Sequence, residues 1–305
     1  MTRRVAITGS HGFIGTNLRA ALAARGDEVV AIARPFDSAR IAADLRGADA
    51  IVHLAGLVSA PREDDFVEAN VDATRAVADG ARRAGVRMIH ISSLAAGGPA
   101  PVSAPRSEDD PPAPITPYGR SKLQGERVVA ATAGLRWTIL RPTVVYGPRD
   151  RAMLALFRFA AAGLMPLVGR STAAYTFVHV DDLVRAVDRA IDADLHGETM
   201  FVAHERPASA RALLEAIAAA VGARASIVTV PMPFLRAAAA AGDVVERLLG
   251  RRVLLDSSRY RELVADGFVC RVDRLRERLG IVAEIGLADG LARTAAWYRS
   301  EGWLR

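Results

Sequence analysis

Tyr118 and Lys122 are the residues in this sequence whose types and spacing most clearly indicate chemistry. Because residues four apart share one face of an α-helix, the ammonium of Lys122 can lie beside the phenol of Tyr118. A free tyrosine has a pKa of about 10, and a nearby cation lowers that pKa toward the range in which the phenol exchanges protons. Lys122 is the only lysine, against 39 arginines, and arginine is a poor replacement for a compact ammonium. We therefore expect this pair to act in proton transfer rather than to face solvent.

A second candidate is the hydroxyl of Ser93, in the pair Ser92-Ser93 at the end of a predicted strand. Ligands of open parallel sheets bind at the carboxyl ends of the strands, so a hydroxyl there can bond a substrate oxygen. A serine pair alone carries little information. Its weight comes from Tyr118 and Lys122 farther along the chain.

A glycine-rich turn, Thr8–Gly15 (TGSHGFIG), lies between a predicted strand and a predicted helix. Its glycines let the backbone approach a pyrophosphate, while the helix N-terminus offers free N–H donors and a partial positive charge. Glycine also serves as a simple turn former, so the motif alone is weak. Three glycines in a strand–turn–helix context favour a dinucleotide-binding site.

The elements that position these residues alternate between apolar strands and segments with helical periodicity. Such alternation predicts a parallel sheet with helices on both faces, a Rossmann-type doubly wound α/β fold. We assign residues 1–170 to this dinucleotide-binding domain. The predicted strands and helices are, in chain order, Val5–Thr8, Phe13–Ala24, Glu28–Ala33, Ala50–Leu54, Asp65–Ala84, Arg87–Ser92, Pro117–Ala133, Arg136–Arg141 and Arg151–Ala162.

Residues 171–305 are expected to form a smaller, mainly helical C-terminal lobe that binds the substrate. The chain is expected to cross between the lobes around residues 175–205. Its predicted helices are Ala210–Val221, Phe234–Leu249 and Asp289–Ser300. The segment Pro99–Pro117 holds seven prolines, which exclude regular helix or strand and predict a loop over the mouth of the sheet.

The composition limits the function classes. With 305 residues, 51% of them hydrophobic and 24% charged, the chain is globular rather than disordered. The single cysteine, Cys270, allows no internal disulfide, and six scattered histidines predict no structural metal. The net charge of +6 is spread over the chain, so we expect no nucleic-acid partner. Without a signal-peptide pattern or a stretch apolar enough to span a bilayer, a cytoplasmic protein is expected.

Together these segments resemble the short-chain dehydrogenase/reductase superfamily, and within it the extended branch. That branch includes nucleotide-sugar epimerases and dehydratases, flavonoid reductases and 3β-hydroxysteroid dehydrogenases. The resemblance covers nearly the whole chain. It rests also on four further segments, His53–Gly56, Asn70–Thr74, Arg141–Pro148 and Val178–Asp182.

The resemblance implies a role for each reactive residue. Tyr118 is implied as the general acid–base, Lys122 as the group that lowers its pKa and holds the nicotinamide ribose, and Ser93 as the partner of the carbonyl oxygen. Ser93 is preferred because the family's catalytic serine is usually the second of the pair. The implied reaction is hydride transfer between the nicotinamide and a carbinol carbon. A homodimer is also implied, in which two helices of each subunit, Asp65–Ala84 and Pro117–Ala133, form a four-helix bundle.

A nicotinamide dinucleotide is the implied cofactor. Arg34 follows the second strand, where an acidic residue would bind the ribose of NAD; an arginine can pair with a 2′-phosphate, which favours NADP over NAD. The alternative is that Arg34 stacks on the adenine or faces water. Only fifteen residues separate Arg34 from Ala50, so the strand that would bring Asp44 to the adenine is either missing or very short. The implied cofactor-binding residues are Gly9, His11, Gly12, Phe13, Ile14, Gly15, Arg34, Leu54, Ala55, Gly56, Asn70, Tyr118, Lys122, Pro142 and Thr143.

Two departures from the nucleotide-sugar branch narrow the substrate. Val144 stands where that branch typically has Asn, and Tyr175 where it commonly has an Arg for the nucleotide phosphates. Because a buried diphosphate needs paired positive charge, we expect an oxidoreductase acting on an alcohol or ketone carbon of a mainly apolar small molecule. The alternative is a nucleotide-sugar epimerase, with Arg170 or Arg149 as substitute phosphate ligands. A non-catalytic dinucleotide sensor is less favoured, since the tyrosine and the lysine are both retained.

Overall fold

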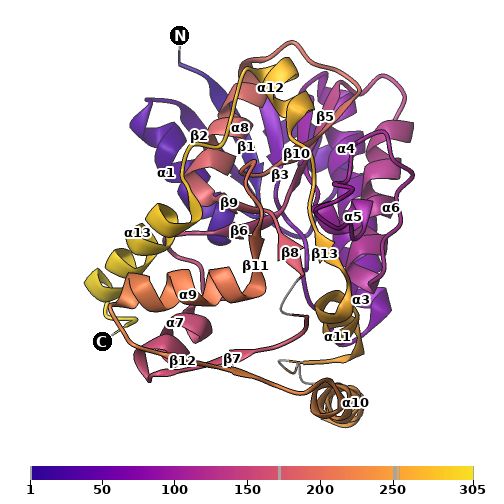
Figure 1. The fold of residues 1–305 in the computed structure, drawn as a ribbon. Coiled ribbons are helices and arrows are strands. Elements are labelled where there is room, and N and C mark those ends of the chain that lie inside the picture. Colours follow the sequence, from indigo (N-terminus) through magenta and orange to yellow (C-terminus); the bar gives the residue numbers. More distant parts are fainter. Residues whose placement is uncertain (1, 171–172, 250–252, 254, 305) are drawn as a thin grey trace.

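The core of the protein is a sheet of six parallel strands in the order β10-β5-β4-β3-β1-β2 (Figure 1). The computed structural model describes residues 2–170, 173–249, 253 and 255–304. The inner strands β1, β3, β4 and β5 are buried on both faces, as is usual for parallel sheets. Their bounds are β1 Arg4–Thr8, β2 Glu28–Ile32, β3 Ala50–His53, β4 Arg87–Ile91, β5 Trp137–Pro142 and β10 Glu198–Val202.

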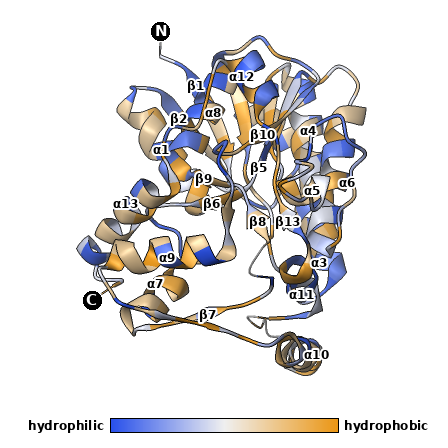
Figure 2. Ribbon diagram, in the orientation of Figure 1, coloured by the Kyte–Doolittle hydropathy of each residue, from blue (hydrophilic) through white to orange (hydrophobic). Residues whose placement is uncertain are grey.

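Helices cover both faces of this sheet, as the doubly wound prediction requires. Alternate residues of each strand point to opposite faces: Val5 and Ile7 of β1 pack with α1 (Phe13–Ala24) and α8 (Val180–Asp192). Between them, Ala6 points to the other face, whose core includes residues of the helices α2 (Ser38–Asp44), α4 (Ala73–Ala84) and α6 (Pro117–Ala131). Figure 2 shows the resulting pattern, with hydrophobic residues concentrated in the sheet and on the helix sides that face it.

The connection from β2 to β3 holds a helix and no strand. Residues 33–49 are all described, and α2 is the regular element among them. Of the two arrangements expected from the short spacing, the structure therefore has the one in which the strand is missing. Asp44 lies in the last turn of α2, with its carboxylate 3.8 Å from the guanidinium of Arg40.

The predicted helix Asp65–Ala84 is present, but it starts at Glu63 and widens in its middle. It consists of α3 (Glu63–Val67), the π-helical turn η1 (Glu68–Asp72) and α4. π-helical turns insert an extra residue into the hydrogen-bond ladder and occur often at functional sites. This one holds Asn70, whose contacts are described below.

Most of the remaining elements form a mainly helical lobe below the sheet in Figure 1, together with short strands, whereas α12 (Asp273–Leu279) lies at the top and packs in the core of the main sheet. Strand β10 and helix α8 belong to the main sheet and its covering layer, so the chain returns to the first lobe between residues 180 and 202. The elements not yet named are α5 Leu94–Gly97, β6 Val144–Tyr146, α7 Leu154–Ala161, β7 Leu164–Leu167, β8 Ala174–Tyr175, β9 Phe177–His179, β11 Ala208–Ser209, α9 Ala210–Val221, β12 Ser226–Thr229, α10 Met232–Leu249, α11 Ser257–Val264, β13 Gly267–Phe268 and α13 Leu287–Ser300.

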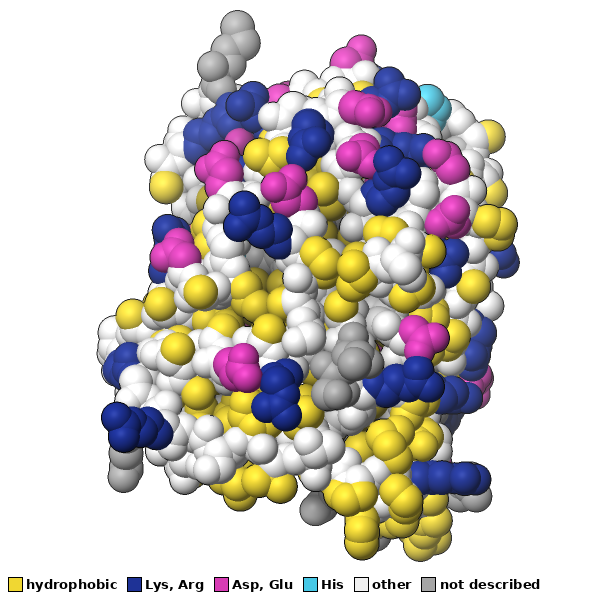
Figure 3. Space-filling model, in the orientation of Figure 1, with side chains coloured by type: hydrophobic (Ala, Val, Ile, Leu, Met, Phe, Trp, Pro, Cys, Tyr) yellow, Lys and Arg dark blue, Asp and Glu magenta, His cyan; other side chains and the backbone are white. Residues whose placement is uncertain are grey.

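The surface carries charges of both signs, with one apolar exception. Figure 3 shows arginines and acidic residues interspersed over most of this face, and hydrophobic side chains gathered over α10 at its lower edge. On that helix Phe234, Val244 and Leu248 are exposed. No helix in the described part of the chain is both long and apolar enough to cross a bilayer.

Candidate active site

The glycine-rich turn forms a concave stretch of backbone, here called the cradle, whose space would be filled if its glycines carried side chains. Gly9 has a φ of +68°, and a Cβ there would lie 2.8 Å from the amide nitrogen of Ala55. A Cβ on Gly15 would overlap the carbonyl oxygen of Gly9. Gly12 precedes the first residue of α1 and supplies no side-chain cap, so the first N–H groups of that helix are left for a ligand.

The other predicted residues of this turn differ in exposure. His11 is exposed, and one of its ring nitrogens lies 3.2 Å from the hydroxyl of Ser10. Phe13 and Ile14, in the first turn of α1, are partly buried and pack against the core beneath the sheet, as does Leu54. These side chains therefore help to fix the position of the cradle.

A cavity of about 400 Å³ adjoins the cradle and is lined by Gly9, Arg34, Ala55 and Gly56. Arg34 is exposed, and its guanidinium lies over the ring of Phe36, 5.3 Å from the centroid. It pairs with no carboxylate of the described chain. An unpaired guanidinium at this cavity can bind a phosphate, although two carboxylates, Asp65 and Glu68, line the same space.

Asn70 braces the wall of this cavity. Its Oδ1 accepts a hydrogen bond from the N–H of Leu57 at 2.8 Å, and its Nδ2 donates to the carbonyl of Leu57 and to the hydroxyl of Ser121, each at 2.9 Å. The side chain is buried, and a Cβ on Gly56 would lie 2.7 Å from Oδ1. Asn70 thus holds the loop after β3 against α6.

Tyr118 and Ser93 meet where β4 and α6 approach each other. Thr116 caps α6 by accepting the N–H of Gly119 at 3.1 Å, and Pro117 occupies the first turn, so the helix begins just before Tyr118. The hydroxyls of Tyr118 and Ser93 are hydrogen-bonded. Both residues line a second, larger cavity. A side chain on Gly119 would overlap the carbonyl of Ala95, so the glycine allows this close approach.

Ser92 faces the protein interior instead. Its hydroxyl donates to the carboxylate of Glu126 on α6, which receives two hydrogen bonds from the guanidinium of Arg141, at 2.8 and 2.6 Å. All three side chains are buried. Of the serine pair, Ser93 is therefore the one placed beside Tyr118.

The protein environment raises the pKa of the Tyr118 phenol. Burial raises the pKa of Tyr118 to about 12; the hydrogen bond from Ser93 lowers it less, and the negative charge of Glu262 raises it further. The ammonium of Lys122 donates to the carbonyl oxygen of Ile91, 2.7 Å away. Burial also lowers the pKa of Lys122 to about 8. In this structure Tyr118 is therefore protonated at neutral pH.

Two buried histidines lie beneath the site on neighbouring strands. The rings of His53 and His90 stack with centroids 5.4 Å apart. His53 is hydrogen-bonded to the hydroxyls of Thr8 and Thr74, at 2.7 and 3.0 Å, while the ring nitrogens of His90 have no partner among the described residues. Burial lowers the pKa of both, that of His53 to about 3, so both are neutral at neutral pH.

The larger cavity measures about 1220 Å³ and reaches from Ser93 and Tyr118 down to α10 and α11. Thr143 also lines it, and Pro142 precedes Thr143 as the buried last residue of β5. Much of its wall is apolar, including Phe66, Val144, Leu156, Phe159, Leu263 and Phe268. Tyr175, at the position where the nucleotide-sugar branch commonly has an arginine, is also part of the wall.

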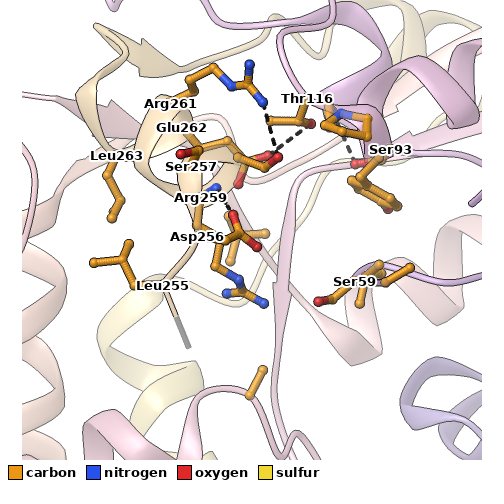
Figure 4. A pocket seen from close by; sticks show the side chains of 18 of the residues that line it. Ser59, Ser93, Thr116, Leu255, Asp256, Ser257, Arg259, Arg261, Glu262 and Leu263 are labelled. Atoms are coloured by element: carbon orange, nitrogen blue, oxygen red, sulfur yellow. Dashed lines mark hydrogen bonds between the residues drawn. The ribbon is translucent and has the colours of Figure 1, made fainter. Parts of the chain in front are cut away.

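Three of the charged residues of this cavity come from α11, a helix that no motif in the sequence singled out. Figure 4 shows Arg259, Arg261 and Glu262 of this helix around the cavity, with Glu262 facing Thr116. The two arginines considered as substitute phosphate ligands lie elsewhere. Arg170 pairs with Asp266, and Arg149 donates to Asn17 at 3.0 Å.

Comparison with known proteins decides the family. The model of the NAD dependent epimerase/dehydratase family matches residues 5–203. The chain belongs to this family. It is 30% identical to ceramide reductase of Caulobacter vibrioides, over 98% of this chain and 96% of that one. It is 31% identical to UDP-glucose 4-epimerase of Mycolicibacterium smegmatis, over 98% and 99%. The solved structure of MoeE5 in complex with UDP-glucose and NAD superposes with a TM-score of 0.79 at 26% identity, covering 98% and 99% of the two chains.

The described residues of this epimerase/dehydratase-family protein fit a nicotinamide dinucleotide. The cradle at Gly9 and Gly15 has no room for side chains, the start of α1 is uncapped, and the adjoining cavity leads to Arg34. Membership does not fix the reaction, since the relatives named include a reductase and an epimerase. The residues that line the substrate cavity are the feature that can separate these two activities.

Proposed function

We propose that this protein is an NAD(P)-dependent oxidoreductase that moves a hydride between the nicotinamide and an alcohol or ketone carbon of a mainly apolar small molecule. The observation that carries the proposal is the placement of Ser93 and Tyr118 on the wall of a large cavity with an extensive apolar lining. Apolar cavities with a few convergent polar groups are the usual form of small-molecule sites. The epimerase named above uses the same family fold, so the cavity lining is the distinguishing feature.

The chain's own groups account for the proton transfer. The bound nicotinamide supplies or accepts the hydride. A substrate carbonyl oxygen placed against Ser93 and Tyr118 would receive hydrogen bonds from both hydroxyls. Because the pKa of Tyr118 is raised to about 12, the phenol holds its proton at neutral pH and can donate it to that oxygen.

In this proposal Lys122 holds the ribose of the nicotinamide half of the cofactor. Its ammonium donates to the carbonyl oxygen of Ile91 at the end of β4, which fixes its position. From there it can donate to the ribose hydroxyls of the nicotinamide half. Thr143, whose hydroxyl is buried and has no partner among the described residues, offers a further donor beside Ser93.

For the cofactor we propose NADP over NAD, because Arg34 lines the adjoining cavity with an unpaired guanidinium. The test is a fluorescence titration with NADPH and with NADH, on the wild type and on Arg34→Ala. A hydrogen-bonded charge pair to the 2′-phosphate is worth about 1.5–3 kcal/mol, so NADPH affinity should fall roughly 10–100-fold while NADH affinity stays constant. Arg40→Ala, on the exposed side of α2, is the matched control. Equal affinities for the two cofactors, unaffected by either variant, would overturn the NADP assignment.

The nucleotide-sugar epimerase remains the second candidate, and one observation favours it. Arg259 and Arg261 line the cavity, and two guanidiniums can bind a diphosphate. The two functions separate in one assay: an epimerase interconverts UDP-glucose and its epimer without net consumption of cofactor, whereas a reductase consumes one NADPH per ketone reduced.

Two further expectations are proposed with this function. The first is a homodimer in which the segment Glu63–Ala84 and helix α6 of two subunits form the four-helix bundle; sedimentation velocity tests it. The second is a cytoplasmic location, tested by fractionation of the source cells.

A non-catalytic dinucleotide sensor would instead bind the cofactor and keep its function in Tyr118→Phe.

A further inference from the structure

Of the hydrogen bonds that the structure describes to carboxylates of the large cavity, the one to Glu262 is the longest. Asp256 accepts the N–H of Arg259 at the start of α11, Asp243 accepts the N–H of Ser257, and Glu246 accepts the N–H of Val253. Glu63 pairs with Arg120 at the cavity edge. The fifth carboxylate that lines the cavity is Glu262, on α11.

Glu262 receives a single hydrogen bond from the described chain. The hydroxyl of Thr116 donates to Oε1 across 3.4 Å, a long bond, and the described residues give Oε2 none. Arg259 lowers the pKa of Glu262 by its charge, but among the described residues it forms no ion pair with it. Glu262 is half-buried, and Oε2 has capacity left for a donor from a ligand.

The place of this carboxylate is next to the reacting groups. Thr116 caps α6 and lies two residues before Tyr118. The negative charge of Glu262 contributes to the raised pKa of Tyr118 and to that of Tyr175, and all three residues line the large cavity. Figure 4 shows Glu262 and Thr116 bonded to each other, with Ser93 close to Thr116.

We propose that Glu262 is a substrate-binding residue that accepts a hydrogen bond from a neutral donor, a hydroxyl or an amide N–H, carried on the carbon next to the reacting ketone. The inference rests on the proposed reductase function and narrows its substrate class to apolar ketones with a neighbouring donor. An anion at that position is repelled by the carboxylate. A cationic ammonium would meet the charges of Arg259 and Arg261 in the same cavity.

The test compares two ketones that differ only in the donor: a linear dodecanone, and the same ketone with an acetamido group next to the carbonyl. The wild type should show the higher kcat/KM for the acetamido ketone. In Glu262→Ala that preference should fall about tenfold, the effect of losing one hydrogen bond to a charged group, mainly through KM. Glu262→Gln, whose amide oxygen still accepts, should retain part of it.

Controls separate binding from a structural role. Glu215→Gln makes the same charge change on the exposed side of α9, outside the cavity, and should leave the preference unchanged. NADPH affinity should be equal in the wild type and in the Glu262 variants. A preference that survives in Glu262→Ala overturns the inference, as does an equal loss of turnover with both ketones.

A binding measurement distinguishes failure of this inference from failure of the proposed function. The acetamido ketone is titrated calorimetrically into Tyr118→Phe protein loaded with NADPH, with and without Glu262→Ala. Glu262-dependent binding without turnover in the wild type keeps the subsite and refutes the reductase. Turnover of both ketones with Glu262-independent binding keeps the reductase and refutes the subsite. No binding of the acetamido ketone also refutes the subsite.

Discussion

The buried ion pair between Glu126 and Arg141 ties the catalytic helix to the sheet, and removing its acid should weaken the whole fold. Glu126 lies one helical turn beyond Lys122 and accepts two hydrogen bonds from Arg141 of β5 and one from Ser92. Both charged side chains are at most 7% exposed. Glu126→Gln keeps the shape and one acceptor oxygen but leaves the guanidinium without a counter-charge.

Breaking a buried pair from one side typically costs about 3–5 kcal/mol. We expect the lower end, about 3 kcal/mol, because the glutamine oxygen still accepts from Ser92 and the guanidinium still lies over the ring of Phe201, 5.5 Å from its centroid. With a urea m-value of about 3 kcal/mol/M, the midpoint of unfolding should fall by about 1 M. Urea unfolding followed by far-ultraviolet circular dichroism measures this.

Two comparisons complete the test. The double variant Glu126→Leu with Arg141→Met replaces both charges by apolar groups, so it should be closer to the wild type than Glu126→Gln is. Asp44→Asn breaks an exposed pair with Arg40 and should change the free energy of unfolding by less than about 1 kcal/mol. A loss below about 1 kcal/mol in Glu126→Gln, or a double variant as unstable as the single one, would refute the reasoning.

Two other residues give further predictions. Gly15→Ala would place a methyl group against the carbonyl of Gly9, so we expect a loss of about 1–3 kcal/mol of stability and at least a tenfold weaker binding of NADPH; unchanged affinity in a fluorescence titration would contradict the cradle. Burial lowers the pKa of Lys122 from 10.5 to about 8, so between these values the folded protein binds fewer protons than the unfolded chain. Raising the pH through this window should therefore increase the free energy of unfolding of the wild type relative to Lys122→Met; parallel pH profiles of urea unfolding would argue against it.

Local patterns in the sequence were sufficient to predict the elements that carry the site. The helices Phe13–Ala24 and Ala210–Val221 have the predicted bounds, because a glycine follows each closely and apolar periodicity runs through both. The strands β1, β3 and β4 lie within one residue of their predicted ends. Capping and hydrophobic periodicity are local signals, and these elements depend mainly on them.

Features that depend on tertiary contacts could not be predicted in this way. The π-helical turn at Asn70 accompanies hydrogen bonds to Leu57 and Ser121, both distant in sequence. The raised pKa of Tyr118 follows mainly from its burial in the folded protein. No local motif connects α11 to the catalytic helix, so the role proposed for Glu262 required the folded arrangement.

The most direct test of the central claim is the transfer of deuterium from NADPH labelled at the nicotinamide C4 position to an apolar ketone, followed by mass spectrometry of the alcohol. The proposed reductase predicts an alcohol that carries the deuterium on its carbinol carbon. Tyr118→Phe should lower the rate at least about a hundredfold, the usual contribution of a positioned acid, with NADPH affinity retained. An unchanged rate in Tyr118→Phe, or no labelled alcohol while UDP-glucose is epimerised without net NADPH consumption, would contradict the account.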